Sequence, residues 1–163
     1  MEARLTALEE GAMCVALSSG TSAVMYSLIN IMSQGDNFVT ANQLYGGTYT
    51  MFDNILPEYS INSKKVDITD LEAVEAAIDE KTRAIYCETI TNPGLVVADI
   101  SALADIAHSK GIPLIVDATF TTSAILKPFE YGADIVVYSL TKWMSGHGRV
   151  IAGAVIEKGG FDW

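Results

Sequence analysis

The sequence predicts an α/β fold of three layers, in which helices cover both faces of a mostly parallel sheet. Three observations lead to this prediction. Short β-rich runs alternate with longer helical segments along the chain. Several of the β-rich runs are continuously apolar, as expected for strands that are covered on both faces. The chain has 163 residues, half of them hydrophobic, which is enough for one domain with a substantial core.

Helical signals occur in five segments, which are 2–10, 20–33, 45–55, 70–79 and 101–110. The fourth segment gives the clearest pattern, because Asp70 is a candidate N-cap and Val74 and Ile78 share one face. In the fifth segment we expect Ser101 to cap the helix and Gly111 to end it.

Strands are predicted at 13–17, 37–40, 83–87, 112–116, 134–138 and 150–156. In doubly wound sheets, ligands bind at the carboxyl ends of the strands. The residues that directly follow the apolar runs are therefore candidates for a site. They are polar, and they comprise Ser18–Thr21, Glu88, Asp117 and Ser139–Lys142. We expect these residues to collect at one edge of the sheet.

Hydroxyl groups and a glycine at two of these positions favour an anion. Gly20 lets the backbone approach a ligand closely, and the first N–H groups of the following helix attract phosphate. The alternative is a plain helix cap made by Ser18 or Ser19. Ser139 and Thr141 lie two residues apart on one extended segment, so both hydroxyls are predicted to donate to the same phosphate. The alternative for this pair is surface hydroxyls at a strand end.

Three further side chains suit an aromatic aldehyde ligand. Asp117 could pair with a protonated ring nitrogen, or it could cap the turn "ATFTTS". Lys142 could form a Schiff base with an aldehyde, for which a desolvated lysine is suited, although most lysines are solvated. Tyr45 offers a plane for stacking on a ring, unless it is a core residue at a helix start. Phosphate donors, a carboxylate and a lysine together are what pyridoxal 5′-phosphate requires.

Five stretches carry a resemblance to a known family. They are "LSSGTSAV", "NQLYGGTY", "ETITNPGL", "LIVDATF" and "VVYSLTKWMSGHG". With them the chain resembles, over nearly its whole length, the fold-type I pyridoxal-phosphate enzymes of cysteine and methionine metabolism. Each stretch is a weak signal alone, but the set is specific.

The resemblance implies a role for each residue of the predicted site. Lys142 corresponds to the lysine that binds the cofactor aldehyde, and Asp117 to the partner of the pyridine nitrogen. Tyr45 corresponds to the stacking residue, which in the family also takes part in proton transfer. Asn92 matches the residue near the cofactor's phenolic oxygen, and Glu88 lies close by without a defined role.

The phosphate site is also implied by the resemblance. It consists of the backbone N–H groups of Gly20 and Thr21 and the hydroxyls of Ser139 and Thr141. One departure is Ala118 in "VDATF", where the family usually has asparagine.

The implied activity is replacement or elimination at the γ-carbon of an amino acid. Gly47 stands where methionine γ-lyases carry cysteine, and the ending "EKGGFDW" resembles the sulfhydrylase branch. Both features favour the reaction of O-acetylhomoserine with sulfide or a thiol, which gives homocysteine or methionine and acetate. Methionine γ-lyase and the cystathionine lyases and synthases are the alternatives.

The resemblance also implies a domain organisation. Residues 1–163 correspond to the cofactor-binding large domain, and the family's N-terminal arm and C-terminal small domain are expected to be absent. The chain alone is therefore expected to be inactive or weakly active, with a non-catalytic cofactor-binding role as an alternative. A homo-oligomer, either a dimer or a tetramer, is expected.

Composition and spacing argue against several other classes. The net charge of −10 disfavours nucleic acid and anionic membranes, and no run is long enough for a membrane span. The charged N-terminus is not a secretory signal, so a cytoplasmic location is expected. Cys14 and Cys87 lie in apolar runs without metal-site spacing, so no metal is expected. The glycines of "GHGRVIAG" miss the dinucleotide fingerprint because Ile151 stands where glycine is needed.

Overall fold

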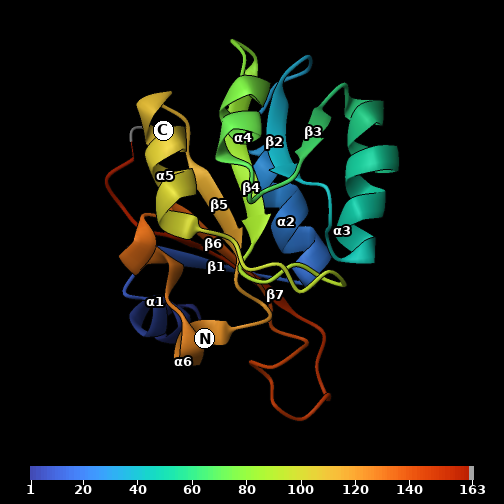
Figure 1. Cartoon of the computed structure of the whole chain (residues 1–163). Coiled ribbons are helices and arrows are strands. Elements are labelled where there is room, and N and C mark those ends of the chain that lie inside the picture. The colour runs from blue at the N-terminus through green and yellow to red at the C-terminus, as the bar shows by residue number, and fades with distance from the viewer. Residues whose placement is uncertain (162–163) are drawn as a thin grey trace.

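Seven strands form one mixed sheet at the centre of the molecule (Figure 1). The structure is a computed structural model and describes residues 1–161. The sheet has the order β1-β7-β6-β5-β4-β2-β3. The strands are β1 (Met13–Leu17), β2 (Asn37–Ala41), β3 (Asn62–Val66), β4 (Thr82–Glu88), β5 (Leu114–Asp117), β6 (Ile135–Ser139) and β7 (Gly153–Glu157).

Six of the seven strands run in the same direction. The neighbours from β6 through β5, β4 and β2 to β3 pair in parallel, whereas β7 is antiparallel to both β6 and β1. The prediction of a mostly parallel sheet is confirmed. Because β1, β4, β5 and β6 share one direction, their carboxyl ends meet at one edge, and β7 begins at that edge.

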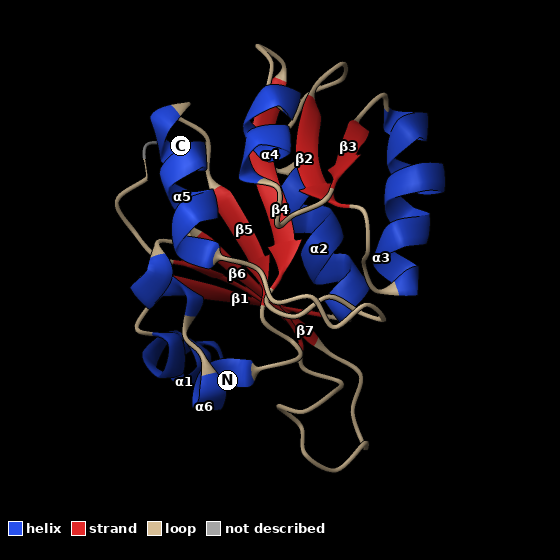
Figure 2. Ribbon diagram, in the orientation of Figure 1, coloured by secondary structure: helices blue, strands red, loops and turns tan. Residues whose placement is uncertain are grey.

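Helices cover both faces of the sheet, which confirms the α/β fold. In Figure 2, α4 and α5 lie in front of the strands and α2 lies behind them. The helices are α1 (Glu2–Glu9), α2 (Gly20–Ile29), α3 (Gly46–Thr50), α4 (Leu71–Ala77), α5 (Ile100–Ser109) and α6 (Thr122–Ile125). A π-helical turn (Met51–Ile55) and a 3₁₀ turn (Leu56–Tyr59) continue α3, and a second 3₁₀ turn spans Pro128–Tyr131. Among residues 1–161, every helix is too short or too polar to cross a membrane.

The continuously apolar runs form the centre of the core. Leu114, Ile115 and Val116 of β5 are fully buried, as are Val136 and Val137 of β6. Burial of such side chains on both faces of a strand is the main favourable contribution to this type of fold.

Several local predictions differ from the structure. Strand β3 was not predicted, because "NSKKV" is polar and lysines are typical of an edge strand. The helix expected over 20–33 ends at Ile29. Asp99 accepts a hydrogen bond from the N–H of Ala102 and is the N-cap of α5, so the prediction of Ser101 was wrong. An aspartate one residue before the first apolar position competes with serine for the same role.

Two predicted helix signals are confirmed. The side chain of Asp70 accepts a hydrogen bond from the N–H of Ala73 at the start of α4. Gly111 follows α5 with φ of +69°, the left-handed conformation that ends helices. The ending "EKGGFDW" lies partly outside the described residues, because the last two positions are not described.

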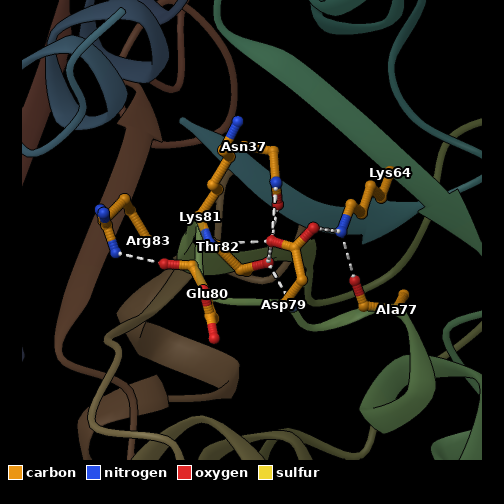
Figure 3. Close-up of polar contacts among 8 residues, drawn as sticks. All are labelled: Asn37, Lys64, Ala77, Asp79, Glu80, Lys81, Thr82 and Arg83. Atoms are coloured by element: carbon orange, nitrogen blue, oxygen red, sulfur yellow. Dashed lines mark hydrogen bonds and ion pairs between the residues drawn. The ribbon is translucent and has the colours of Figure 1, made fainter. Parts of the chain in front are cut away.

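The opposite edge of the sheet is held by a polar cluster around Asp79 (Figure 3). Its carboxylate accepts hydrogen bonds from Asn37 Nδ2 at 2.9 Å and from Lys64 Nζ at 2.7 Å. These contacts lower the pKa of Asp79, the ion pair with Lys64 being the largest cause. The cluster connects the turn before β4 to β2 and β3, so it fixes three strands at the end remote from the predicted site.

The first turn of α2 packs directly on the end of β6. A Cβ atom at Gly20 would lie 2.4 Å from the Cβ of Ser139 and 2.8 Å from its Oγ atom. The Cα atom of Ser139 would also be 2.8 Å away, and neither Cα nor Cβ can move away without shifting a chain segment. Glycine is therefore required by this contact, which brings the helix N-terminus beside the strand end.

We predict that Gly20→Ala lowers the free energy of unfolding by about 1–3 kcal/mol, because the added methyl group overpacks the contact with Ser139. Gly46→Ala is the matched control, since Gly46 is also the first residue of a helix and a Cβ there meets no atom within 4 Å. Urea unfolding measures the free energy of unfolding of both variants and of the wild type. Equal stability of the two variants would contradict this account of Gly20.

Candidate functional site

All eight residues assigned to the cofactor site line one pocket of about 670 Å³, whereas Ser18 and Leu140 of the polar strand ends do not line it. The pocket lies at the edge where β1, β4, β5 and β6 end. The predicted residues in its lining are Gly20, Thr21, Tyr45, Asn92, Asp117, Ser139, Thr141 and Lys142. Glu88 also lines it. Within residues 1–161 no cluster of three or more histidine, cysteine or acidic side chains could hold a metal ion.

The N-terminus of α2 forms one end of the pocket. Ser19 is the N-cap, and its hydroxyl accepts a hydrogen bond from the N–H of Ser22 at 3.0 Å. This confirms the capping alternative for Ser19, but the cap uses only the N–H of Ser22, so other N–H groups of the first turn stay available to a ligand. No hydrogen bond within the described residues uses the N–H of Gly20 or Thr21. The two amides and the helix dipole therefore present positive potential to the pocket.

Ser139 and Thr141 both line the pocket, but they differ in their bonding. Ser139 is the last residue of β6, and its hydroxyl has no hydrogen-bond partner among the described residues. Thr141 lies in a turn, and its hydroxyl donates to the carbonyl of Ala152 at 3.2 Å and accepts from its N–H at 3.1 Å. The prediction of one extended segment over both residues was wrong, because the strand ends at Ser139. Thr141 would have to exchange its bond to Ala152 to reach a phosphate.

Lys142 follows in the same turn and contributes its side chain to the pocket wall. Its backbone N–H donates to the carbonyl of Ser139 at 3.2 Å, which fixes the turn. The side chain is exposed and forms no ion pair with a described residue. In this structure Lys142 is therefore solvated, which is the alternative that the sequence left open.

Asp117 ends β5 and combines the two roles that the sequence left open. Its Oδ1 atom accepts a hydrogen bond from the N–H of Thr119 at 2.9 Å, which is the turn interaction. Its Oδ2 atom accepts from the hydroxyl of Tyr86 at 3.3 Å, and the side chain lines the pocket. Burial raises the pKa of Asp117, although the bonds from Thr119 and Tyr86 oppose this effect. A cation in the pocket would relieve the cost of burying this charge.

Ala118, which departs from the family pattern, is not part of the pocket lining. Its side chain is fully buried, and its N–H donates to the carbonyl of Val137 at 3.0 Å. Its effect on the site is therefore indirect.

Tyr45 precedes α3, and 46% of the residue's surface is exposed. A Cβ atom at Gly47 would lie 2.8 Å from Cε1 of the Tyr45 ring. A side chain at position 47 would therefore displace the ring, so the absence of one gives Tyr45 its present position.

Glu88 is the residue whose role sequence reasoning left undefined. It ends β4, and only 5% of its surface is exposed. Its Oε1 atom accepts a hydrogen bond from the N–H of Tyr45 at 2.7 Å, and Oε2 accepts from the N–H of Asn92 at 3.0 Å. In the sheet, Glu88 is the register partner of Asp117.

The pKa of Glu88 is raised from its ordinary value of 4.5 to about 7; burial is the largest cause, and the neighbouring Asp117 contributes in the same direction. The hydrogen bonds from Tyr45 and Asn92 oppose the increase. The pocket thus holds two adjacent acids, and at neutral pH one of them is close to its titration midpoint.

Thr119 is a site residue that the sequence analysis missed. Its hydroxyl accepts a hydrogen bond from the N–H of Ser139 at 2.7 Å, and it also lines the pocket. This bond ties the turn after β5 to the end of β6. The available signal was its position two residues after Asp117, where a turn residue is expected.

The family model described as "Cys/Met metabolism PLP-dependent enzyme" matches residues 1–163. The chain therefore belongs to this family of pyridoxal-phosphate-dependent enzymes.

Two curated relatives are similar over the whole chain. Homocysteine synthase of Schizosaccharomyces pombe is 46% identical over 163 residues, which cover 99% of this chain and 38% of that protein. O-acetyl-L-homoserine sulfhydrylase of Leptospira meyeri is 42% identical over 163 residues, which cover 100% of this chain and 37% of that protein. The chain thus spans less than two fifths of the length of these relatives.

Two solved structures share the fold. A putative O-acetylhomoserine (thiol)-lyase from Campylobacter jejuni has a TM-score of 0.94 and 40% identity, and the match covers 96% of this chain and 39% of that one. That structure contains N′-pyridoxyl-lysine-5′-monophosphate. Cystathionine γ-lyase from Lactobacillus plantarum in complex with L-serine has a TM-score of 0.92 and 40% identity, and the match covers 97% of this chain and 41% of that one.

We predict that the stability of wild type relative to Glu88→Gln falls as pH rises. A carboxyl group whose pKa is higher in the folded than in the unfolded protein contributes its full stabilisation at a pH below its pKa in the unfolded protein. This contribution is lost as the pH rises through the pKa in the folded protein. The difference in unfolding free energy should therefore change between about pH 4.5 and pH 7, by on the order of 3 kcal/mol. Urea unfolding at a series of pH values measures it.

Glu10→Gln serves as a control of opposite sign. Glu10 pairs with Lys127, which lowers its pKa, so its contribution is present above 4.5 and is lost as pH falls further. If the stabilities of wild type and Glu88→Gln ran parallel from pH 4.5 to pH 7, the account of Glu88 would be wrong.

Proposed function

We propose that the protein binds pyridoxal 5′-phosphate in this pocket and acts on O-acetylhomoserine with sulfide or a thiol, giving homocysteine or methionine and acetate. The observation that carries the proposal is the convergence, in one pocket, of every residue type the cofactor needs. Unbonded amides at a helix N-terminus suit a phosphate, a partly buried carboxylate suits a protonated ring nitrogen, and a lysine without an ion-pair partner suits an aldehyde.

The residues present fit this cofactor. The N–H groups of Gly20 and Thr21 and the hydroxyl of Ser139 provide three donors, and none of them is used elsewhere in the described chain. Asp117 is partly buried, burial raises its pKa, and no described cation pairs with it. The pyridoxyl-lysine group in the Campylobacter protein supports the same assignment by similarity.

Each side chain then has a chemical task. Bound pyridoxal phosphate supplies an electron sink that stabilises negative charge on the substrate. The amine of Lys142 takes the proton from the α-carbon and moves protons to and from the β-carbon. With the cofactor bound, the carboxylate of Asp117 would keep the proton on the ring nitrogen, and the ring of Tyr45 would offer a stacking surface. Acetate leaves the γ-carbon, and the sulfur of sulfide or a thiol takes its place.

The choice of the sulfhydrylase reaction rests on two kinds of support. The similar curated relatives include a homocysteine synthase and an O-acetyl-L-homoserine sulfhydrylase. Gly47 lets the ring of Tyr45 lie where a cysteine side chain would collide with it. The expected homo-oligomer remains a prediction.

We predict that wild-type protein incubated with pyridoxal phosphate becomes yellow, and that borohydride fixes a pyridoxyl group on the peptide containing Lys142. Lys142→Ala should lose this adduct, because no other lysine lines the pocket within the described residues. Lys81→Ala is the control, since Lys81 lies in the cluster at the opposite edge and should keep the adduct (Figure 3). Mass spectrometry of the reduced, digested protein reads the result, and an intact adduct in Lys142→Ala would refute the assignment.

We predict that the loaded protein forms homocysteine and acetate from O-acetylhomoserine and sulfide faster than it forms ammonia from methionine alone. The rate of homocysteine formation in one assay and the rate of ammonia formation in the other are measured in parallel by chromatography. Faster release of ammonia from methionine would favour a γ-lyase, and cofactor binding without any turnover would favour the non-catalytic alternative.

A further inference from the structure

Glu88 connects two loops that form one side of the pocket. The first loop leads from β2 into α3 and contains Tyr45, and the second follows β4 and contains Asn92. Tyr45 and Glu88 are 43 positions apart in the chain. Among the described residues, Glu88 is the only acceptor for the backbone N–H of either Tyr45 or Asn92.

The two loops also contact each other directly. Gln43 of the first loop lies against Gly94 of the second, where a Cβ atom would be 1.4 Å from the Oε1 atom of Gln43. The second loop is internally rigid, because the N–H of Leu95 donates to the carbonyl of Thr91 at 2.8 Å and that of Val96 donates to the Thr91 hydroxyl at 3.0 Å. The carboxylate of Glu88 therefore holds two ordered segments against each other.

A carboxylate is the side chain that meets this requirement. Each of its two oxygens accepts one backbone N–H, and the side chain is buried, so water cannot replace either bond. A glutamine has the same shape but offers one oxygen and one NH₂ group, so one backbone donor would face another donor. A buried donor without an acceptor is costly, and the loop that carries it would shift to find one.

We propose that Glu88 is a positioning residue for the ring-binding side of the pocket: its carboxylate sets the places of Tyr45 and Asn92, from which their side chains reach the bound cofactor. This proposal rests on the proposed function. It assigns Glu88 no contact with the cofactor and no proton transfer. The phosphate-binding end of the pocket, formed by Gly20 of α2 and Ser139 of β6, lies on other elements. A substitution of Glu88 should therefore not change the positions of these two residues directly.

The test is a double-mutant cycle on the dissociation constant of pyridoxal phosphate, measured by absorbance titration for wild type, Tyr45→Ala, Glu88→Gln and the double variant. The titrations are made above the Glu88 pKa of about 7, where the wild-type side chain is a carboxylate. Glu88→Gln alone should raise the constant about tenfold or more, as expected when one buried bond is lost. In the Tyr45→Ala background the same substitution should raise it less, because one of the two side chains through which Glu88 acts has been removed. Additive effects in the cycle would overturn the proposal.

Hydrogen exchange in the cofactor-free protein provides a second readout. The amides of Tyr45 and Asn92 should exchange faster in Glu88→Gln than in wild type, because at least one of them loses its acceptor. Unchanged protection of both amides would overturn the proposal. If both amides lose protection but the wild-type protein binds no cofactor, the proposed function is wrong. Glu88 then only connects the two loops, and its positioning role toward a cofactor is overturned as well.

Two further variants separate geometry from charge and from stability. Glu88→Asp keeps the charge but is one methylene shorter, so it should not reach both amides and should also weaken cofactor binding; wild-type affinity in this variant would overturn the proposal. Asp134→Asn is the matched control. Asp134 directly precedes β6, far from the pocket, and its buried carboxylate accepts a hydrogen bond from the N–H of Leu114 at 2.8 Å. It should leave the dissociation constant unchanged, and an equal loss of affinity in both variants would mean that Glu88→Gln acts through stability alone.

Discussion

The common direction of six strands is the constraint on which the pocket depends. In a parallel pair, equivalent ends lie side by side, so residues from distant parts of the chain meet without any local signal. The register places Glu88 of β4 directly beside Asp117 of β5. Ser139 ends the next strand, and the first turn of α2 packs on it because Gly20 has no side chain. Each polar group is thus supplied by a separate strand end or helix start.

This arrangement has an electrostatic consequence. A buried acid, Glu88, and a partly buried one, Asp117, lie next to each other, and the pKa of each is raised chiefly by burial. Backbone and hydroxyl donors offset part of the cost, but no described cation pairs with either acid. Such a pocket favours a ligand with a cationic group at the acidic end and an anionic group at the helix N-terminus. Pyridoxal phosphate with a protonated ring has both charges.

The acids and hydroxyls of the pocket differ in how much their bonding restricts them. Asp117 forms a turn bond and also faces the pocket, so its structural role does not exclude a role toward a ligand. Thr141 has a hydroxyl that is fully engaged with Ala152, whereas that of Ser139 is not engaged. Glu88 uses both oxygens on backbone N–H groups, which leaves the side chain suited to holding loops in place.

The sequence by itself determined the fold class, the four polar strand ends and the composition of the site. These follow from patterns within single segments, namely apolar runs, helix caps and the polar residues after them, combined with the rule that parallel strands end at one edge. Strand β3 was not predicted from the sequence, because its residues are mostly polar and form no apolar pattern. Only the tertiary structure decided which hydroxyl is engaged, that Lys142 is exposed, and that Glu88 joins Tyr45 to Asn92. Those properties arise from contacts between segments far apart in the chain, and no local pattern encodes the distance between two such groups.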